Sequence, residues 1–320
     1  MKQRRILVVG SSNTDMVIRT DHLPVAGETI LGGTFFMNPG GKGANQAVAI
    51  ARLEGDVAFI CKIGKDVFGY QSQQLFEDEG IDTSYIFFDA EYPSGIAMIT
   101  VDNKAENSIT VASGANMNLT PDDLETAKDA IEEADIILLQ LEIPMETVEY
   151  VAQTAVKLNK KVILNPAPAR PLSGELLKSL YLITPNETEA ELLTGQKITN
   201  VETAVRAASL IKDMGVDNVI ITMGSQGALV YAGSLCELVP AYPVKAIDTT
   251  AAGDIFNGAL VVALAEGYGW IEAARFACKA SAIAVTREGA QSSAPYRNEV
   301  DSFRPDEKEV ETSCTNQLIL

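Results

Sequence analysis

Short apolar runs alternate with amphipathic segments through the C-terminal two-thirds of the chain. The apolar runs at residues 136–141, 161–164, 181–184 and 219–222 have the length and composition of strands buried on both faces. Helices are predicted at residues 120–134, where Thr120, Pro121 and Asp123 form a helix-start signature, around residues 148–155, and at 201–214, 252–266 and 271–286. Strands that alternate with helices predict an α/β fold, in which a parallel sheet has helices on both sides.

Two segments depart from this alternation. Residues 17–36 and 94–112 alternate loosely between apolar and polar positions, contain turn residues and lack an apolar helical face. They predict a small antiparallel β-sheet outside the parallel one, made from separated segments at about residues 14–39 and 93–113, that could cover a cleft. Residues 228–239 predict a β-hairpin around Gly233 and Ser234. We expect one domain over residues 1–303 and a polar, acidic, flexible tail at 304–320.

The composition fits a globular protein with a sizeable core. Of the 320 residues, 47% are hydrophobic and 21% are charged. The 25 Lys and Arg residues are outnumbered by 43 Asp and Glu residues, which gives a net charge of −18. This acidic excess disfavours nucleic acid and anionic membrane surfaces as partners, since both attract clustered cationic residues.

The sequence carries no signal for export, membrane insertion or a structural metal. No apolar run approaches the ~18 residues of a transmembrane helix, and the apolar run near the N-terminus is too short for a signal peptide. The cysteines, Cys61, Cys236, Cys278 and Cys314, lack metal-binding spacing. We therefore expect a soluble, cytoplasmic protein with reduced thiols.

The strongest local signal for chemistry is the segment at residues 248–254, Asp-Thr-Thr-Ala-Ala-Gly-Asp, which precedes an Ala-rich helix. Small residues at a helix start leave backbone N–H groups uncovered, and these groups attract an anion together with the helix dipole. Asp254 lies in the first helical turn, where it can act as a general base beside that anion. The alternative is an ordinary acidic residue that stabilises a helix start.

A second, glycine-rich segment opens a helix at residues 38–47, Asn-Pro-Gly-Gly-Lys-Gly-Ala-Asn-Gln-Ala. It is neither a Walker A loop nor a dinucleotide fingerprint, because the spacing of both is absent. Its glycines let the backbone, Lys42 and Asn45 approach a small polar ligand closely. The alternative is a plain glycine turn with a solvated lysine.

Polar residues follow several of the predicted strands. They are Asn13 and Asp15, Glu142, Asn165, residues 186–189 and residues 222–227. Because the carboxyl ends of parallel strands meet at one edge of a sheet, these residues predict a single polar cleft at that edge.

These motifs resemble those of a known family. The segments at 40–47 and 248–258 are similar to the two signatures of the PfkB carbohydrate kinases, and those at 165–170, 183–190 and 284–291 resemble the branch that phosphorylates D-ribose. The resemblance runs collinearly from about residue 6 to residue 303. It implies a three-layer α/β core with a mostly parallel central sheet and a small discontinuous β-sheet lid. It also implies ATP-dependent phosphorylation of D-ribose at O5, giving D-ribose 5-phosphate and ADP.

The resemblance implies roles for individual residues. Asp254 would be the base that accepts the proton of the 5-hydroxyl, and Ala251, Ala252 and Gly253 would form the anion hole. The sugar hydroxyls would meet Asn13, Asp15, Gly41, Lys42, Asn45 and Glu142. The nucleotide site would be lined by Asn186, Thr222, Met223, Gly224, Ser225, Gln226 and Gly227, with Gly253, Asp254 and Cys278. Cys278 departs from the family, which often has Asn or His there, so the adenine contacts at that position are left open.

The same resemblance implies two metal ions and a dimer. Mg²⁺ would accompany ATP as co-substrate, with Glu189 acting on it through water. K⁺ would activate the enzyme from a site beside the anion hole, several of whose ligands are backbone carbonyls; the matching residues are Asp248, Thr250, Ala284, Arg287, Gly289 and Ser293. Two subunits would pack through their lids as a homodimer.

Two other functions stay open on the sequence alone. One is another kinase of the same family, acting on deoxyribose, fructose, a keto-deoxy sugar acid or a nucleoside; the absence of an aromatic platform in the sugar motifs disfavours the nucleoside. The other is a non-catalytic sugar sensor, against which an intact Asp254 and anion hole argue, because binding alone needs no base. The single histidine, His22, falls in the lid and is expected at the surface.

Overall fold

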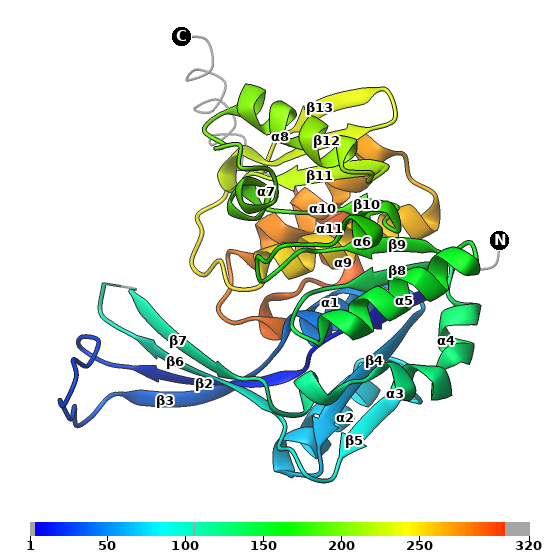
Figure 1. Ribbon diagram of the computed structural model, residues 1–320. Helices are drawn as coiled ribbons and strands as arrows, with labels where there is room; N and C mark the ends of the chain where they lie inside the picture. Colours follow the sequence, from blue (N-terminus) through cyan, green and yellow to red (C-terminus); the bar gives the residue numbers. More distant parts are fainter. Residues whose placement is uncertain (1–3, 105, 305–320) are drawn as a thin grey trace, which may run out of the picture.

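The computed structural model describes residues 4–104 and 106–304, which form two β-sheets and the helices packed on them (Figure 1). In this part of the chain the larger sheet has nine strands, in the order β13-β12-β11-β10-β9-β8-β1-β4-β5. They are β1 (Ile6–Val9), β4 (Val57–Gly64), β5 (Ile86–Asp89), β8 (Ile136–Leu139), β9 (Lys161–Leu164), β10 (Leu182–Ile183), β11 (Asn218–Thr222), β12 (Ala228–Ala232) and β13 (Leu235–Val239). Only the β11–β12 and β12–β13 pairings are antiparallel.

Helices cover both faces of this sheet, so the predicted three-layer α/β core is confirmed. One face carries α1 (Lys42–Arg52), α2 (Val67–Asp78), α9 (Ala252–Glu266), α10 (Trp270–Ala284) and α11 (Arg297–Ser302). The other carries α3 (Pro121–Thr126), α4 (Lys128–Glu133), α5 (Met145–Lys157), α6 (Gly174–Lys178), α7 (Glu187–Thr194) and α8 (Val201–Asp213). Successive side chains of a strand point to opposite faces, so Ile6 and Val8 pack in the first core and Leu7 and Val9 in the second.

The smaller sheet, called the lid sheet below, extends away from the core (Figure 1). Its strands are β2 (Asn13–Arg19), β3 (Thr34–Gly40), β6 (Gly95–Val101) and β7 (Asn107–Ala112), in the order β3-β2-β6-β7. The prediction of a second sheet from two separated segments is confirmed. The prediction that it is antiparallel is wrong in one respect: β2 and β6 pair in parallel, with Asn13 opposite Gly95, because both strands enter the sheet from the core side.

Most other predicted elements are present, with shifted ends. The hairpin at 228–239 forms from β12 and β13, and α9 occupies the predicted range. The strand predicted at 136–141 ends at Leu139, because the next backbone groups leave the ladder and Leu141 N donates to Ala167 O at 2.9 Å. The helix predicted at 271–286 runs from Trp270 to Ala284.

The helix predicted at 120–134 is two helices, α3 and α4, separated at Ala127. The capping box at Thr120 and Asp123 is formed as expected. The Thr126 hydroxyl donates to the carbonyl of Asp123 at 2.7 Å, and that carbonyl would accept from Ala127 N in a continuous α-helix. Ala127 N donates to Leu124 O instead, which tightens the chain and ends α3.

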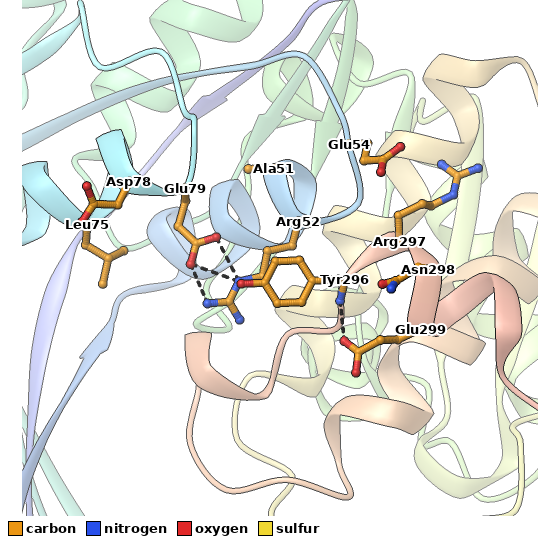
Figure 2. A pocket seen from close by; sticks show the side chains of 10 residues that line it. All are labelled: Ala51, Arg52, Glu54, Leu75, Asp78, Glu79, Tyr296, Arg297, Asn298 and Glu299. Atoms are coloured by element: carbon orange, nitrogen blue, oxygen red, sulfur yellow. Dashed lines mark hydrogen bonds and ion pairs between the residues drawn. The ribbon is translucent and has the colours of Figure 1, made fainter.

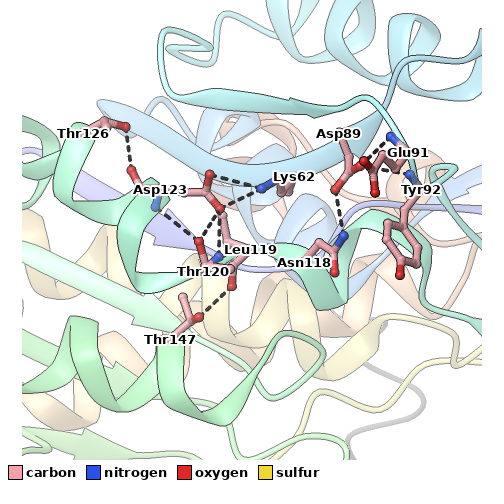
Figure 3. A network of polar contacts seen from close by, with 10 residues as sticks. All are labelled: Lys62, Asp89, Glu91, Tyr92, Asn118, Leu119, Thr120, Asp123, Thr126 and Thr147. Carbon is pink, nitrogen blue, oxygen red and sulfur yellow. Dashed lines mark hydrogen bonds and ion pairs between the residues drawn. The ribbon is translucent and has the colours of Figure 1, made fainter.

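The region between residues 57 and 89, where no element was predicted, forms β4, α2 and β5. A polar network joins this region to the segment that follows the lid (Figure 3). Lys62 of β4 donates to Asp123 Oδ2 at 2.8 Å, and Asn118 of the 3₁₀ helix η1 (Gly114–Asn118) donates to Asp89 at 2.9 Å. The network therefore fixes one end of the lid sheet to the core. A second 3₁₀ helix, η2 (Gly224–Gln226), follows β11, and a third, η3 (Gln291–Ser293), precedes α11.

Among the described helices, none combines the length and apolar composition that crossing a membrane requires. The predicted tail at residues 304–320, which includes Cys314, lies outside the described residues except for residue 304.

Candidate active site

The predicted polar residues gather at the carboxyl edge of the large sheet, where α1 and α9 begin. These two helices pack closely because small residues face each other: a Cβ built at Gly258 would lie 2.8 Å from the Cβ of Ala49. The contact brings the first turns of both helices together. Asn45 and Gln46 of α1 therefore reach Asp254 in the first turn of α9.

Asp254 is buried, with 4% of its surface exposed, and both of its carboxylate oxygens accept a hydrogen bond. Asn45 Nδ2 donates to Oδ2 at 2.9 Å, and Gln46 Nε2 donates to Oδ1 at 3.1 Å. Burial raises the pKa of Asp254, while Lys42 and the two amide donors act in the opposite direction. A carboxylate in this setting is held in place and remains a good proton acceptor.

Lys42 is the positive centre of the site. Its pKa is raised, mainly by Asp254 and further by Glu142 and Glu189, although its burial acts against this. These three carboxylates come from three different parts of the chain, which shows that the fold directs negative charge at one ammonium group. Because these carboxylates repel an anion, an anionic ligand is favoured in the cleft only near Lys42 and the helix starts.

Asp15 and Glu142 lie on the lid side of this charge cluster. Burial, together with the charges of Glu142 and Asp254, raises the pKa of Asp15 to about 6. Glu142 accepts from the Ser11 hydroxyl at 2.5 Å and from Lys42 N at 3.0 Å, both through Oε2. Its other oxygen has no protein donor within the described residues, so it can accept from a ligand hydroxyl.

Asn13 lies where the chain passes from the core into the lid sheet. Its side-chain oxygen accepts from Asn116 Nδ2 at 2.8 Å, and Asn116 also accepts from Ser12 N at 2.9 Å. Neighbouring glycines are required by this packing, since a Cβ at Gly41 would lie 2.7 Å from Asn13 N and one at Gly95 would overlap Asn13 Oδ1. Among the described residues the amide nitrogen of Asn13 has no acceptor, so it is available as a donor to a ligand.

The start of α9 has the form expected of an anion hole. Ala251 adopts a left-handed conformation, with φ of 59°, which a non-glycine residue takes up at a cost in free energy. A Cβ built at Gly253 meets nothing within 4 Å, so open space adjoins the backbone there. Across the described residues, the N–H groups of Gly253 and Asp254 donate to no protein acceptor, as is usual in a first helical turn. These features fit a bound phosphoryl group.

The residues predicted for the nucleotide site lie beyond α9 on the same edge. Asn186 caps α7 in a box with Glu189, whose Oε2 accepts from Asn186 N at 2.8 Å. Asn186 also bridges Thr222, the last residue of β11, and the turn from Met223 to Gly227 follows directly. Gly224 and Gly227 have positive φ, and a Cβ at Gly227 would overlap Val239 O, so glycine is required there. Burial raises the pKa of Glu189, which also lies within the field of Lys42.

Cys278 is the predicted nucleotide residue that the described contacts do not bring to this edge. It lies on the buried face of α10, is 6% exposed and packs in the core, and burial alone raises the pKa of its thiol to about 12.

The two loops predicted to share a monovalent cation meet beside the start of α9. Asp248 accepts from Gly289 N and from Thr250 N, each at 2.9 Å, and these bonds lower the pKa of its carboxyl against the effect of burial. Ala284 O accepts from Arg287 N at 2.9 Å, and the Ser293 hydroxyl donates to Ala290 O at 2.7 Å. The Arg287 side chain turns to Glu299, at 2.5 Å, so only its backbone is left toward the loops. A carboxylate and carbonyls in converging loops are the hard oxygen donors that K⁺ prefers.

The residues present also suit a divalent metal that arrives with phosphates. Among the described residues, no group of three or more His, Cys, Asp or Glu side chains is placed to hold a metal ion by itself. Mg²⁺ commonly keeps several waters and binds through substrate phosphates and one or two carboxylates. Glu189, buried and facing Lys42, is a carboxylate of this kind.

A hollow of about 840 Å³ lies away from these residues, between the ends of α1, α2 and α11 (Figure 2). Its cations are already paired: Arg52 bonds Glu79 at 2.5 Å, and Arg297 bonds Glu266 at 2.5 Å. Arg52 also donates to Gln291 O at 2.7 Å and to Ala294 O at 3.0 Å. Arg52, at the edge of this hollow, therefore has a structural role: it holds the loop that carries Ser293.

Sequence reasoning missed four residues that support the site: Ser11, Gln46, Asn116 and Gln140. Gln46 lies inside the glycine-rich motif, and Gln140 is the one polar residue in an otherwise apolar run, which was a usable signal. Nothing in the pattern around Asn116 distinguishes it from other loop residues.

Comparisons with known proteins agree with this geometry. A family model described as pfkB family carbohydrate kinase matches residues 3–297. A curated ribokinase of Haemophilus influenzae is 46% identical over 301 residues, which cover 94% of this chain and 98% of that protein. A deoxyribokinase of Salmonella typhi is 38% identical over 300 residues, covering 93% and 98%. A solved structure of Arabidopsis thaliana ribokinase complexed with ribose and ATP matches with a TM-score of 0.88 at 34% identity, covering 94% of this chain and 99% of that one.

Proposed function

Since the chain belongs to the pfkB family of carbohydrate kinases, we propose that it transfers the γ-phosphoryl group of ATP to O5 of D-ribose, giving D-ribose 5-phosphate and ADP. The observation that carries this proposal is the buried Asp254 carboxylate, held by two amide donors in the first turn of a helix whose start has room for a phosphoryl group. Relatives named ribokinase support D-ribose as the acceptor.

In the proposed reaction, D-ribose binds between the lid sheet and the core. Asn13, Asp15, Gly41, Lys42, Asn45 and Glu142 contact its hydroxyls, and Asp254 accepts the proton of the 5-hydroxyl as O5 attacks the γ-phosphorus. The O5–P bond forms while the bond from the γ-phosphorus to the bridging oxygen of ADP breaks. Ala251, Ala252 and Gly253 form the anion hole, in which the N–H of Ala252 also donates to Thr249 O at 3.2 Å while that of Gly253 has no acceptor among the described residues. This hole and the Lys42 ammonium stabilise the negative charge on the transferred group. Asn186 and residues 222–227 line the nucleotide site.

The choice of sugar follows from the polar lining. Buried donors and acceptors that lose their partner cost about 1–3 kcal/mol each. We therefore expect 2-deoxyribose, which lacks one hydroxyl, to react with a kcat/KM roughly 10-fold or more below that of D-ribose. Competition between the two sugars, read out by mass spectrometry of the products, measures this ratio. A preference for 2-deoxyribose would assign the chain to the deoxyribokinase branch instead.

We infer that a divalent metal, Mg²⁺, enters with ATP and neutralises phosphate charge, with Glu189 orienting its water, and that K⁺ binds beside the anion hole. The residues that would hold K⁺ are Asp248, Thr250, Ala284, Arg287, Gly289 and Ser293, several of them through backbone carbonyls. A cation there strengthens the positive field at the start of α9 without touching the sugar.

Replacing K⁺ by tetramethylammonium at equal ionic strength should lower kcat and weaken ATP binding, while the KM for D-ribose stays unchanged. Asp248→Ala should abolish this response, because the variant loses the only carboxylate of the set. Asp301→Ala removes an exposed carboxylate elsewhere and is the matched control. Rates that do not differ between the two salts, in enzyme freed of bound K⁺, would leave Asp248 as a loop cap only.

We further propose a homodimer formed through the lid sheets. Phe35, Met37 and Met98 are 56%, 49% and 55% exposed and lie on one face, opposite to the face that carries Asp15. An apolar sheet face of this kind favours contact with a second copy, since burying it removes water from several large side chains. Cys61, Cys236 and Cys278 are free thiols. Because free thiols are typical of a reducing compartment, we also propose a cytoplasmic location.

Light scattering after gel filtration should give twice the chain mass for the wild type and the single mass for Phe35→Asp combined with Met98→Asp. Val156→Asp, an exposed apolar position on α5, should stay dimeric. A wild-type protein with the mass of one chain at micromolar concentration would contradict the dimer.

Residues 1–303 are proposed to act as one kinase domain with the lid as its mobile cover. A sugar kinase for another acceptor is the second candidate, and the 38% identity to a deoxyribokinase is the observation that favours it. The sensor alternative is not retained, because the chain belongs to a kinase family and keeps the carboxylate and helix start that chemistry needs.

A further inference from the structure

A chain of buried amides ends on the carboxylate of Asp254. Gln46, which is 0% exposed, uses both hydrogens of its Nε2: one goes to Asp254 Oδ1 at 3.1 Å and the other to Asn165 Oδ1 at 3.2 Å. Its Oε1 accepts from Gln140 Nε2 at 2.6 Å. Every polar atom of the Gln46 side chain is therefore engaged, and the side chain has one amide orientation.

The backbone around this relay is shaped to fit it. A Cβ at Gly10 would overlap Gln140 Oε1, so the glycine at the end of β1 makes room for the Gln140 amide. Asn165 donates to Thr184 O at 3.3 Å, the Thr184 hydroxyl donates to Asn257 Oδ1 at 2.6 Å, and Asn257 Nδ2 donates to Gly253 O at 2.8 Å. The relay thus returns to the first turn of α9, one residue from Asp254.

We propose that Gln46 is a positioning residue that holds the Asp254 carboxylate in its proton-accepting orientation and favours its ionised form, with Gln140 fixing the orientation of the Gln46 amide. This inference rests on the proposed role of Asp254 as the base. Because Gln46 is fully buried, it acts through Asp254 and does not touch the sugar or ATP.

The physical reason lies in the direction of the hydrogen bonds. An N–H donor stabilises a carboxylate but offers nothing to the O–H of a protonated carboxyl group. If the Gln46 amide were reversed, its Oε1 would face Asp254 Oδ1, and two acceptors would repel each other unless the carboxyl were protonated. The donor supplied by Gln140 Nε2 opposes that reversal.

Other charged groups also influence the ionisation of Asp254, in addition to the Gln46 hydrogen bond. Lys42 on α1 favours the ionised form, whereas Glu142 after β8 disfavours it, and Asp254 in turn acts on Asp15 of β2 and Glu189 of α7. Burial and Glu142 oppose ionisation of Asp254, so Lys42 and the two amide donors, Asn45 and Gln46, together set the pH at which the base becomes available.

The test compares pH profiles of kcat for the wild type and Gln46→Met with D-ribose and ATP. Losing a hydrogen bond to a charged group should move the acid limb to higher pH by about one to two units. On the acid limb the variant is then slower by up to about 10-fold to 100-fold, and it recovers toward the wild-type rate at high pH, with both KM values little changed. Gln140→Leu, which leaves Gln46 Oε1 without its donor, should shift the limb in the same direction by less.

Two controls separate the outcomes. Asn218→Ala removes a buried amide that bonds Tyr181 O at 2.8 Å far from the site; it should lower thermal stability and leave the acid limb in place. A Gln46→Met variant that loses activity equally at all pH values, or keeps the wild-type acid limb, overturns the positioning role. Should Gln46→Met fail to fold, an unshifted limb in Gln140→Leu overturns it. An active Asp254→Asn variant measured in parallel would instead overturn the role of the base itself.

Discussion

Replacing Asp254 by Asn is expected to lower kcat by about 10²–10⁴-fold, the range that a positioned general base contributes. The amide cannot accept the proton of the 5-hydroxyl, and its NH2 group faces either Asn45 or Gln46, both of which are donors, so one of the two hydrogen bonds is lost. Steady-state rates of ADP formation measure the loss. Calorimetric titration with D-ribose and with a non-hydrolysable ATP analogue should show that binding is largely retained.

The control for this variant is Asp122→Asn. Asp122 is likewise an acidic residue in a first helical turn, at the start of α3, but it is exposed and remote from the site. It should keep the wild-type rate. If Asp254→Asn retained more than about a tenth of the wild-type kcat, Asp254 would be a helix-start residue and not the base.

Replacing Lys42 by Met should have the second largest effect, a loss of about 10²-fold or more in kcat/KM. Asp254, Glu142 and Glu189 all act on this ammonium group, and removing one partner of a largely buried charge set leaves the others uncompensated, at a cost of about 3–5 kcal/mol when burial is complete. The pKa of Asp254 should rise in the variant, because Lys42 is the main charge that lowers it. The acid limb of the pH profile should therefore also move to higher pH.

Lys62→Met is the matched control for this charge removal. Lys62 is partly buried and pairs with Asp123 at 2.8 Å, outside the cleft. Its loss should reduce the free energy of unfolding and leave kcat/KM close to that of the wild type. A Lys42→Met variant with a kcat/KM within about threefold of the wild type would mean that Lys42 is solvated and serves no catalytic purpose, since a threefold change is only ~0.6 kcal/mol.

The sequence predicted those parts of the fold that depend on local pattern. The buried runs of β8, β9 and β11 and the Ala-rich α9 follow from periodicity and composition, and the start of α3 follows from its capping box. The pairing of β2 with β6 does not, because it joins residues about 80 positions apart and depends on where both strands leave the core. The break at Ala127 depends on the hydrogen bond of the Thr126 hydroxyl, which the hydrophobic periodicity of the sequence does not reveal.

The residues of the candidate site also fall into those that local pattern identifies and those that it does not. Motif residues such as Asp254, Lys42 and Asn45 were identifiable because small residues and glycines mark backbone that must approach a ligand. Gln46, Gln140 and Asn116 were not, because their importance comes from contacts with residues 94 to 208 positions away. A buried amide inside an apolar run, as at Gln140, is the local sign that such a partner exists.

The position of the transferred phosphate tests the central proposal most directly. Purified enzyme is incubated with ATP, Mg²⁺, K⁺ and D-ribose, and the product is examined by ³¹P NMR without proton decoupling. The proposal predicts ADP together with one new phosphate ester whose signal is split by the two hydrogens on C5. A phosphate signal split by a single hydrogen, which places the ester on another carbon, or release of inorganic phosphate alone, would contradict it.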